Sequence, residues 1–170
     1  MEDVIRAFVP DDWEAVSQIY KQGIDTNLAT FQVSCPTFEE WDNSHLSFCR
    51  YVFIHEGRVA GWSALSPVSS RCVYSGVAEV SIYIALSSRS SGVGTKLLNQ
   101  TVEESQRQGI WTLQSGIIED NTASIRLHQK CGFRVVGYRE KIARDAQGLW
   151  KNTVLMERRS QLDFPLTSAR

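Results

Sequence analysis

The spacing of apolar residues changes period along the chain, and the clearest change lies near its centre. Residues 77–84 are mostly apolar or β-branched, with polar side chains at alternate positions, which predicts a strand. Residues 93–108 carry apolar side chains at the spacing of an amphipathic helix, which Gly109 ends. The run Arg89-Ser90-Ser91-Gly92-Val93-Gly94 joins the two segments. The pattern therefore predicts that the helix begins inside a glycine-rich turn directly after the strand.

The other periodic segments predict a single domain of strands and helices. Further strands are expected at residues 3–8, 51–56, 58–65, 110–117, 133–143 and 149–158. Further helices are expected from Pro10 to about Lys21, from a capping box at Thr37 to about Phe48, and from Asn121 to Lys130. Residues 22–36 and 66–75 are expected to be irregular, and residues 160–170 to form a tail. This order predicts an α/β fold, a three-layer α/β/α sandwich with a mixed sheet, in one domain over residues 1–159.

Composition narrows the possible functions. The net charge of the 170 residues is −1 and no basic stripe stands out, so nucleic acid is not an expected partner. No apolar run of about 20 residues occurs and the acidic N-terminus is unlike a signal peptide, so we expect no membrane partner and a cytoplasmic location. The cysteines and histidines show no metal-ligand spacing; they are Cys35, Cys49, Cys72, Cys131, His45, His55 and His128. We therefore expect reduced thiols and no metal.

The glycine-rich turn has the features of an anion site. The first N–H groups of a helix have no partner inside the helix, and they lie at the positive end of its dipole. Glycines let a ligand come close to that end, as phosphate groups do in many proteins. Thr95-Lys96 stands in the wrong order for a nucleotide P-loop, and the glycine spacing is not that of a dinucleotide-binding loop. The turn therefore predicts a phosphate ligand of another kind.

The run from Arg89 to Gly94 resembles R/Q-x-x-G-x-G/A, the pyrophosphate loop of the GNAT family of N-acetyltransferases, which bind acetyl-CoA. The expected element order is also that of the family. Three passages resemble its phosphinothricin and methionine sulfoximine N-acetyltransferases; they are Thr30-Phe31 with Pro36 and Trp41, then Arg71, Tyr74, Glu79 and Tyr83, then Asn121, Ser124, Leu127, His128, Cys131, Gly132 and Phe133 with Gly148 and Trp150. The resemblance implies a splayed sheet, acetylation of a small amine by direct attack on acetyl-CoA, and a homodimer.

The resemblance also implies which residues bind the cofactor. The strand before the loop would bond the pantetheine arm or the thioester carbonyl through its backbone, the loop would bind the pyrophosphate, and two polar residues at the start of the next helix would assist. These residues are Ile82, Tyr83, Ile84, Arg89, Ser90, Ser91, Gly92, Val93, Gly94, Thr95, Asn121 and Ser124.

Catalysis needs a group that removes a proton from the amine, because amines of amino acids are mostly protonated at neutral pH. Glu79 is the candidate base, because a carboxylate in an apolar strand is costly to bury unless it is used or paired. In the resembled branch the matching glutamate has this role. His128 lies on one helical face with Asn121 and Ser124, where many family members carry a tyrosine as general acid. His128 would protonate the leaving thiolate or only pack beside it, and both alternatives stay open.

The resemblance places Phe31, Arg71, Tyr74, Glu79 and Tyr83 around the amine substrate. An arginine suits a substrate carboxylate because its planar fork can bond both oxygens. Four other large aromatic residues are expected in the core rather than in the site; they are Trp62, Trp111, Phe133 and Trp150.

Three functions fit these residues. The preferred one is acetylation of the α-amine of a small amino-acid-like substrate, since Arg71 favours a free carboxylate. The second is acetylation of a protein N-terminus or a lysine on the same fold. The third is a non-catalytic acyl-CoA sensor, which would keep the loop from Arg89 to Gly94 but would not need Glu79.

Overall fold

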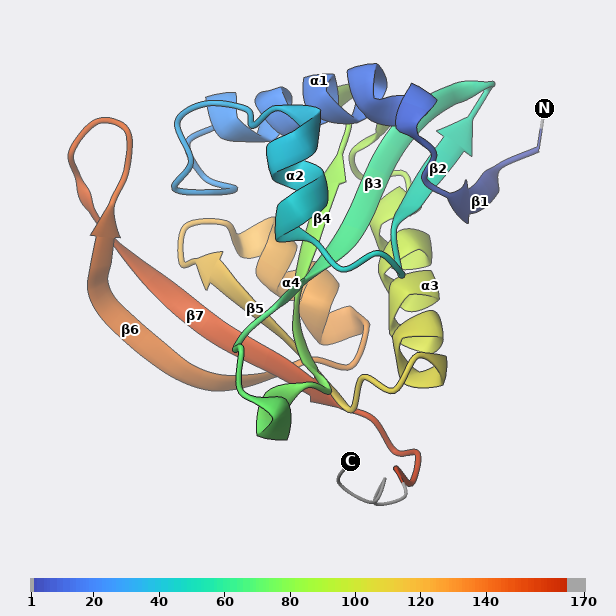
Figure 1. The fold of residues 1–170 in the computed structure, drawn as a ribbon. Coiled ribbons are helices and arrows are strands. Elements are labelled where there is room, and N and C mark those ends of the chain that lie inside the picture. The colour runs from blue at the N-terminus through green and yellow to red at the C-terminus, as the bar shows by residue number, and fades with distance from the viewer. Residues whose placement is uncertain (1, 165–170) are drawn as a thin grey trace.

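A computed structural model describes residues 2–164 and forms one seven-stranded mixed sheet with four α-helices (Figure 1). The strand order is β1-β2-β3-β4-β5-β7-β6. The strands are β1 (Val4–Ala7), β2 (Tyr51–His55), β3 (Arg58–Pro67), β4 (Val77–Ile84), β5 (Thr112–Ile118), β6 (Arg134–Arg144) and β7 (Trp150–Arg159). The helices are α1 (Trp13–Asp25), α2 (Phe38–Ser44), α3 (Val93–Arg107) and α4 (Thr122–Lys130).

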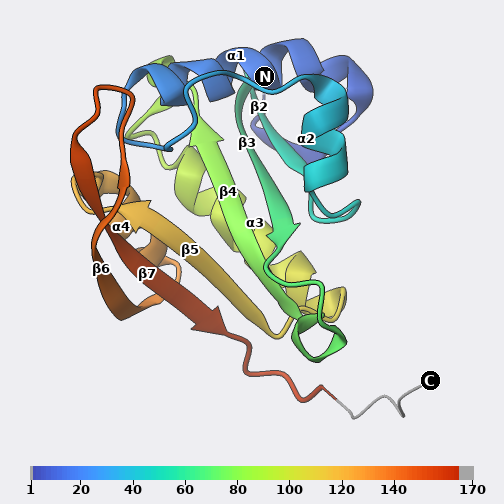
Figure 2. The same ribbon diagram turned by 60° about the vertical axis from the view of Figure 1, so that its left-hand side comes forward.

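Helices cover both faces of the sheet, which confirms the predicted three-layer sandwich (Figure 2). On one face, Val16 and Ile19 of α1 and Trp41 of α2 pack on β2 and β3. On the other face, Leu97 and Leu98 of α3 pack on β2, β3 and β4. Trp62 and Phe133 lie in these cores, as predicted.

Two helix boundaries differ from the predicted ones, and neighbouring contacts explain both. The capping box at Thr37 starts α2 as predicted, with Glu40 as its second member, but α2 ends at Ser44 rather than Phe48. The side chain of Arg50 donates hydrogen bonds to carbonyl oxygens of Asp42, His45 and Leu46, and so satisfies the end of the helix. Helix α1 runs on to Asp25, four residues past Lys21.

A glycine in the last turn of α1 accounts for the second difference. A Cβ on Gly23 would lie 2.6 Å from Cδ1 of Tyr83, so glycine lets α1 pack directly on β4. In the sequence, a glycine at this position is typical of the end of a helix and the start of a loop. It instead marks the place where α1 comes closest to the strand that carries Tyr83.

The central feature of the sheet is that β4 and β5 separate. They pair in parallel over only three rungs: Val77 with Thr112, Ala78 with Leu113, and Glu79 with Gln114. β4 then continues for five more residues, to Ile84, beside β3 alone. The expected splay of the sheet is therefore present, and it begins directly after Glu79.

The last two strands form a long hairpin that projects from the side of the molecule (Figure 1). β7 pairs with β5, and β6 is the edge of the sheet. Trp150 was expected in the core, but its side chain is 52% exposed on this hairpin, and the Arg144 guanidinium lies over its ring at 4.4 Å. Trp111 is only partly buried, against Gly76. Of the expected tail, residues 165–170 lie outside the described residues.

Membrane-spanning helices and clusters of metal ligands both bear on function. Within residues 2–164, no helix is both long and apolar enough to cross a bilayer, and no three His, Cys, Asp or Glu residues gather where they could hold a metal. Cys35, Cys49, Cys72 and Cys131 are free thiols.

Candidate active site

The turn between β4 and α3 has the backbone geometry that an anion site needs. Gly92 precedes the helix with φ 84°, a left-handed conformation, and Ser90 also has positive φ, at 62°. The first backbone bond of the helix runs from the N–H of Lys96 to the Gly92 carbonyl oxygen. The preceding N–H groups, from Val93 to Thr95, have no acceptor earlier in the helix. They are therefore available to a ligand at the start of α3.

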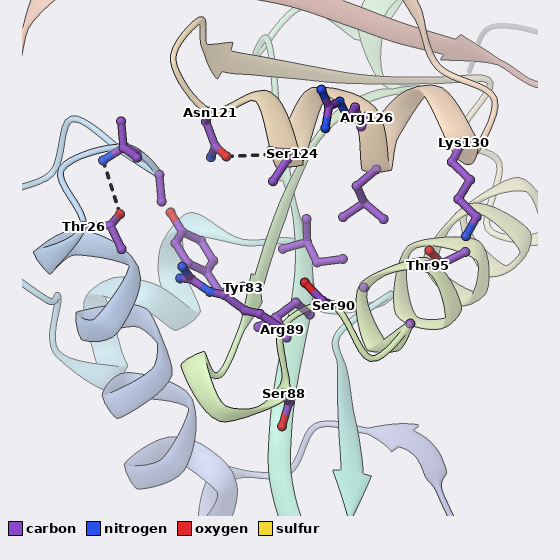
Figure 3. A pocket seen from close by; sticks show the side chains of 18 residues that line it. Thr26, Tyr83, Ser88, Arg89, Ser90, Thr95, Asn121, Ser124, Arg126 and Lys130 are labelled. Atoms are coloured by element: carbon purple, nitrogen blue, oxygen red, sulfur yellow. Dashed lines mark hydrogen bonds between the residues drawn. The ribbon is translucent and has the colours of Figure 1, made fainter.

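A cavity of about 460 Å³ lies between this turn and α4, and we call it the loop cavity (Figure 3). Ten of the twelve expected cofactor residues line it; they are Ile82, Tyr83, Ile84, Arg89, Ser90, Gly92, Gly94, Thr95, Asn121 and Ser124. The two others do not. The side chain of Val93 is buried in the core, and the Ser91 hydroxyl donates to the carbonyl oxygen of Ser88. Any contact that Ser91 or Val93 makes with a ligand in the loop cavity would come from the backbone.

A second cavity, of about 470 Å³, opens where β4 and β5 separate, and we call it the strand cavity. Glu79, His128, Phe31 and Tyr83 all line it, so the structure brings together four expected residues from three parts of the chain: β4, α4 and the segment after α1. The two cavities share five lining residues; they are Ala29, Ile82, Tyr83, Asn121 and Ser124. The two cavities therefore adjoin at these residues.

Glu79 is held from the neighbouring strand. The side-chain Nε2 of Gln114 donates a hydrogen bond to Oε2 of Glu79, with a donor–acceptor distance of 3.0 Å. Both residues are partly buried, and they are the last pair of the β4–β5 ladder. Glu79 therefore lies at the point where the strand cavity begins.

His128 is buried and its protonation state follows from its contacts. Its side chain is 1% exposed, and Nδ1 lies 2.7 Å from the carbonyl oxygen of Ser124. A carbonyl oxygen only accepts, so Nδ1 carries the proton. Burial lowers the pKa of the imidazole below its ordinary value. The ring is therefore neutral near pH 7, and Nε2, which has no partner among the described residues, is an acceptor.

This geometry fits the packing alternative for His128, since its ring meets the Phe133 ring edge-on with centroids 5.0 Å apart and Nε2 is itself buried. A neutral ring with its proton on Nδ1 has none at Nε2 to give to a thiolate. The general-acid alternative would require Nε2 to take up a proton first.

Tyr83 separates the cavities from the core. Its ring stacks on Trp62 at 5.0 Å and on Tyr20 at 4.8 Å, which fixes it against α1. Burial raises the pKa of the Tyr83 phenol, so its hydroxyl remains protonated at neutral pH and can donate a hydrogen bond. Tyr83 therefore offers a rigid apolar face with one polar end.

Arg71 and Tyr74 are not brought to either cavity. Arg71 precedes the 3-10 turn Cys72–Tyr74 and Tyr74 ends it; the turn lies just before the part of β4 that pairs with β5, and both residues are exposed. The Arg71 guanidinium lies over the Tyr74 ring at 5.6 Å. The reason is the direction of β4, because this turn is at the start of the strand (Figure 2), whereas the β4 residues that line the cavities run from Glu79 to the end of the strand at Ile84. Their role as ligands of a substrate carboxylate stays a prediction.

No arginine or lysine is among the described residues that line the strand cavity. Its ionisable groups are Glu79, His128, Tyr20 and Tyr83. A cationic or neutral amine is compatible with this lining. A substrate carboxylate would need a cation from outside the cavity.

Several lining residues were missed from the sequence. Arg126 and Lys130 add two basic side chains from α4 to the loop cavity (Figure 3), and they follow the expected residue Asn121 at five and nine positions. Arg126 and Lys130 are one helical turn apart, but neither is at same-face spacing from Asn121 or Ser124, so the helical pattern carried no signal for them. The segment after α1 contributes Thr26, Leu28, Ala29, Thr30 and Gln32. Only Phe31 was expected from this segment, because it has no periodic pattern.

The arrangement has the parts that acyl transfer to an amine requires. Helix-end N–H groups with Arg89, Arg126 and Lys130 suit a polyphosphate in the loop cavity. A carboxylate and an imidazole acceptor in the strand cavity suit removal of protons from an amine. The shared wall would bring an acyl group and an amine together at the fork of β4 and β5.

Comparisons with known proteins agree with this interpretation. Residues 13–133 match the model of the acetyltransferase (GNAT) family. The chain is 30% identical to an L-methionine sulfoximine/L-methionine sulfone acetyltransferase of Salmonella typhimurium, over 86% of this chain and 88% of that protein.

Solved structures agree as well. The crystal structure of a GNAT superfamily phosphinothricin acetyltransferase from Sinorhizobium meliloti in complex with AcCoA is 26% identical and superposes with a TM-score of 0.85, over 94% and 89% of the two chains. The ribosomal-protein-alanine N-acetyltransferase of Brucella melitensis is also 26% identical, with a TM-score of 0.84 over 92% and 99%.

Proposed function

Because the chain belongs to the acetyltransferase (GNAT) family and is an acetyl-CoA-dependent N-acetyltransferase, we propose that it acetylates the α-amine of a small amino-acid-like substrate of the phosphinothricin or methionine sulfoximine type. The observation that carries this proposal is the strand cavity, which Glu79, His128, Phe31 and Tyr83 line and which adjoins the loop cavity. The relatives named for these two substrates support the substrate class.

Acetyl-CoA would place its phosphates at the start of α3 and extend its pantetheine arm along the unpaired part of β4. The arginine at position 89 and the basic residues of α4, Arg126 and Lys130, would balance the phosphate charge. The thioester would then lie at the shared wall of the two cavities. Backbone N–H groups of β4 beyond its pairing with β5 would donate hydrogen bonds to the thioester oxygen as negative charge develops on it.

The amine would enter the strand cavity, and Glu79 would accept its excess proton directly or through a water molecule. The amine nitrogen then attacks the carbonyl carbon, the carbon–sulfur bond breaks, and the thiolate leaves. The thiol of coenzyme A resembles cysteine, with a pKa of about 8.5, so it is a good leaving group. Nε2 of His128 is an acceptor in the resting protein and would take the second proton of the amine before any transfer to sulfur.

A thiol-release assay on matched substrates tests the proposal. Methionine sulfoximine and phosphinothricin should be acetylated, and the corresponding amines without the α-carboxylate should react much more slowly. Glu79→Gln should lower kcat/KM by about 10²–10⁴ near pH 7, with a smaller loss at higher pH where free amine is available. A variant as fast as the wild type at pH 7 would remove Glu79 from the mechanism.

The role of Arg71 is tested in the same assay. If its guanidinium bonds the substrate carboxylate, Arg71→Lys should reduce the preference for the carboxylate-bearing substrate, because lysine cannot reproduce the fork. Equal kcat/KM for both members of each pair in the wild type would refute selection of a carboxylate.

The second candidate is acetylation of a protein N-terminus. Two observations favour it: the described lining residues of the strand cavity include no arginine or lysine, and a ribosomal-protein-alanine N-acetyltransferase is among the similar structures. A peptide with N-terminal alanine is the substrate that decides. Robust turnover of the peptide together with none of the free amino acids would replace the first candidate with the second.

We also propose that the enzyme is a cytoplasmic homodimer that associates through the β6–β7 hairpin. β6 is an edge strand, and the hairpin exposes apolar side chains at Val135, Val136, Tyr138, Ile142, Leu149 and Trp150. Light scattering after size-exclusion chromatography should give twice the chain mass, and Ile142→Glu should reduce it. A monomeric wild type at micromolar concentration would refute association.

A further inference from the structure

Gln114 lies at the fork of the sheet. It is the last residue of β5 that pairs with β4, opposite Glu79, and the following residues Ser115 and Gly116 line the strand cavity. Paired residues of parallel strands project their side chains on the same face of the sheet, side by side. This placement explains why an amide on one strand can reach a carboxylate on the other.

The contact between the two side chains is specific. Nε2 of Gln114 donates to Oε2 of Glu79 at 3.0 Å, and this is the only side-chain partner of Glu79 in the described part of the chain. Gln114 lines neither cavity, so it is not placed to touch a substrate or the cofactor itself. Its effect on the reaction would pass through Glu79.

An amide is a suitable partner for a catalytic base. It donates a hydrogen bond that fixes one carboxylate oxygen, and it leaves the other oxygen free to accept a proton. A lysine or arginine in the same place would form a stronger charge-assisted bond and would reduce the basicity of the carboxylate much more. A carboxylate without a partner would retain several rotamers, and only some would point at the amine.

We propose that Gln114 is a positioning residue that holds Glu79 in the rotamer needed to take the proton of the amine. The inference rests on the proposed role of Glu79. It adds that the last rung of the β4–β5 ladder supplies both the base and the group that orients it.

The other titratable groups that line the strand cavity do not obscure a test. Burial raises the pKa of the phenols of Tyr20 and Tyr83, and burial lowers the pKa of His128. The two phenols are therefore neutral in the weakly acidic range, and the imidazole takes up its proton only below its ordinary range. A shift of the acid limb that appears in Gln114→Met, and does not appear when Glu79 is already glutamine, would report on Glu79.

The test replaces Gln114 by methionine, which has a similar length and no donor. Gln114→Met should lower kcat/KM for the amine by about fivefold to thirtyfold, mainly through kcat. The acid limb should move to higher pH, because the charged carboxylate loses its donor. The dissociation constant of acetyl-CoA should stay unchanged, because Gln114 does not line the loop cavity. A merely structural role would lower stability without moving the pH profile.

A double-mutant cycle separates this inference from the proposed function. In Glu79→Gln, the further change Gln114→Met should cost less than twofold, because the base is already lost. If Glu79→Gln is impaired while Gln114→Met matches the wild type in rate and pH profile, the positioning role is wrong and Glu79 remains the base. If Glu79→Gln retains full activity, the base assignment itself is wrong.

A second variant covers the case in which Gln114→Met does not fold. Gln114→Glu keeps the size and shape of the side chain but faces Glu79 with a second carboxylate. It should move the acid limb to higher pH by more than Gln114→Met, because like charges disfavour ionisation of their neighbour. An unchanged profile in Gln114→Glu would overturn the inference.

Discussion

Replacing Gly92 by alanine should weaken acetyl-CoA binding through the backbone alone. Gly92 precedes α3 with φ 84°, and a Cβ at this position would meet no atom within 4 Å. The substituted methyl group therefore collides with nothing in the protein. What changes is the conformational preference, because a left-handed conformation costs an ordinary L-residue about 1–2 kcal/mol.

The cost falls on the state that binds the ligand. In the free variant the turn can relax to a right-handed or extended conformation, which moves the first N–H groups of α3 away from their common direction. Acetyl-CoA must then restore the left-handed turn, and its affinity should fall by the same free energy. A cost of about 1–2 kcal/mol corresponds to about fivefold to thirtyfold in the dissociation constant.

Calorimetry with coenzyme A and acetyl-CoA measures the effect, and Gly92→Asn is the matched control. Asparagine also carries a Cβ, but it tolerates the left-handed conformation much better. Gly92→Asn should therefore bind more tightly than Gly92→Ala. Equal losses in both variants would mean that the Cβ blocks the ligand itself, and wild-type affinity in Gly92→Ala would refute the conformational argument.

Three further predictions concern other parts of the site. Arg89→Ala should weaken acetyl-CoA by about 1.5–3 kcal/mol, roughly tenfold to a hundredfold, if its guanidinium meets the phosphates; unchanged calorimetric affinity would contradict this. Asn27 has φ 57°, and its Nδ2 donates a hydrogen bond to Oδ2 of Asp145 at 3.2 Å. Asn27→Gly should therefore keep the backbone conformation but remove the bond that ties residues 26–32 to the β6–β7 hairpin. The Michaelis constant for the amine should rise severalfold and amide exchange in this segment should accelerate; unchanged exchange would show that the bond does not restrain the segment. The pKa of His128 in the folded protein lies below its unfolded value of about 6.5, so the unfolded state binds more protons. The free energy of unfolding should therefore fall as pH decreases through 6.5, by at most about 1.4 kcal/mol per pH unit. Urea unfolding at pH 7.5 and 5.5 should show a smaller difference in His128→Gln than in the wild type, and equal differences would contradict the assignment.

Much of the fold and half of the site could be predicted from the sequence because they depend on local patterns. The alternation of residues 77–84, the glycines of the following turn and the helical spacing of Asn121, Ser124 and His128 each act over a few residues. Such patterns are determined by the geometry of single strands and helices. The structure brings these three segments around the two cavities, as expected.

The remaining features depend on contacts between distant segments. The spacing of Arg71 before Glu79 says nothing about the direction in which β4 opens, and the structure places Arg71 at the opposite end of the strand from the cavities. Trp150 is apolar enough for a core, but β6 leaves it at an edge of the sheet. Gln114 was not recognised because its partner Glu79 is 35 residues away, and only the parallel pairing brings them together.

The separation of β4 and β5 would also link the stability of the protein to the supply of acetyl-CoA. The backbone groups of β4 beyond Glu79 that face β5 lack a strand partner in the described chain, and acetyl-CoA bound along them would supply part of the missing ladder. A ligand that binds only the folded state adds stability as the logarithm of its concentration, about 2.7 kcal/mol at a hundredfold excess over its dissociation constant. When acetyl-CoA is scarce, this enzyme would therefore open at the fork and unfold more often, and its abundance in the cell would follow the supply of the acetyl donor.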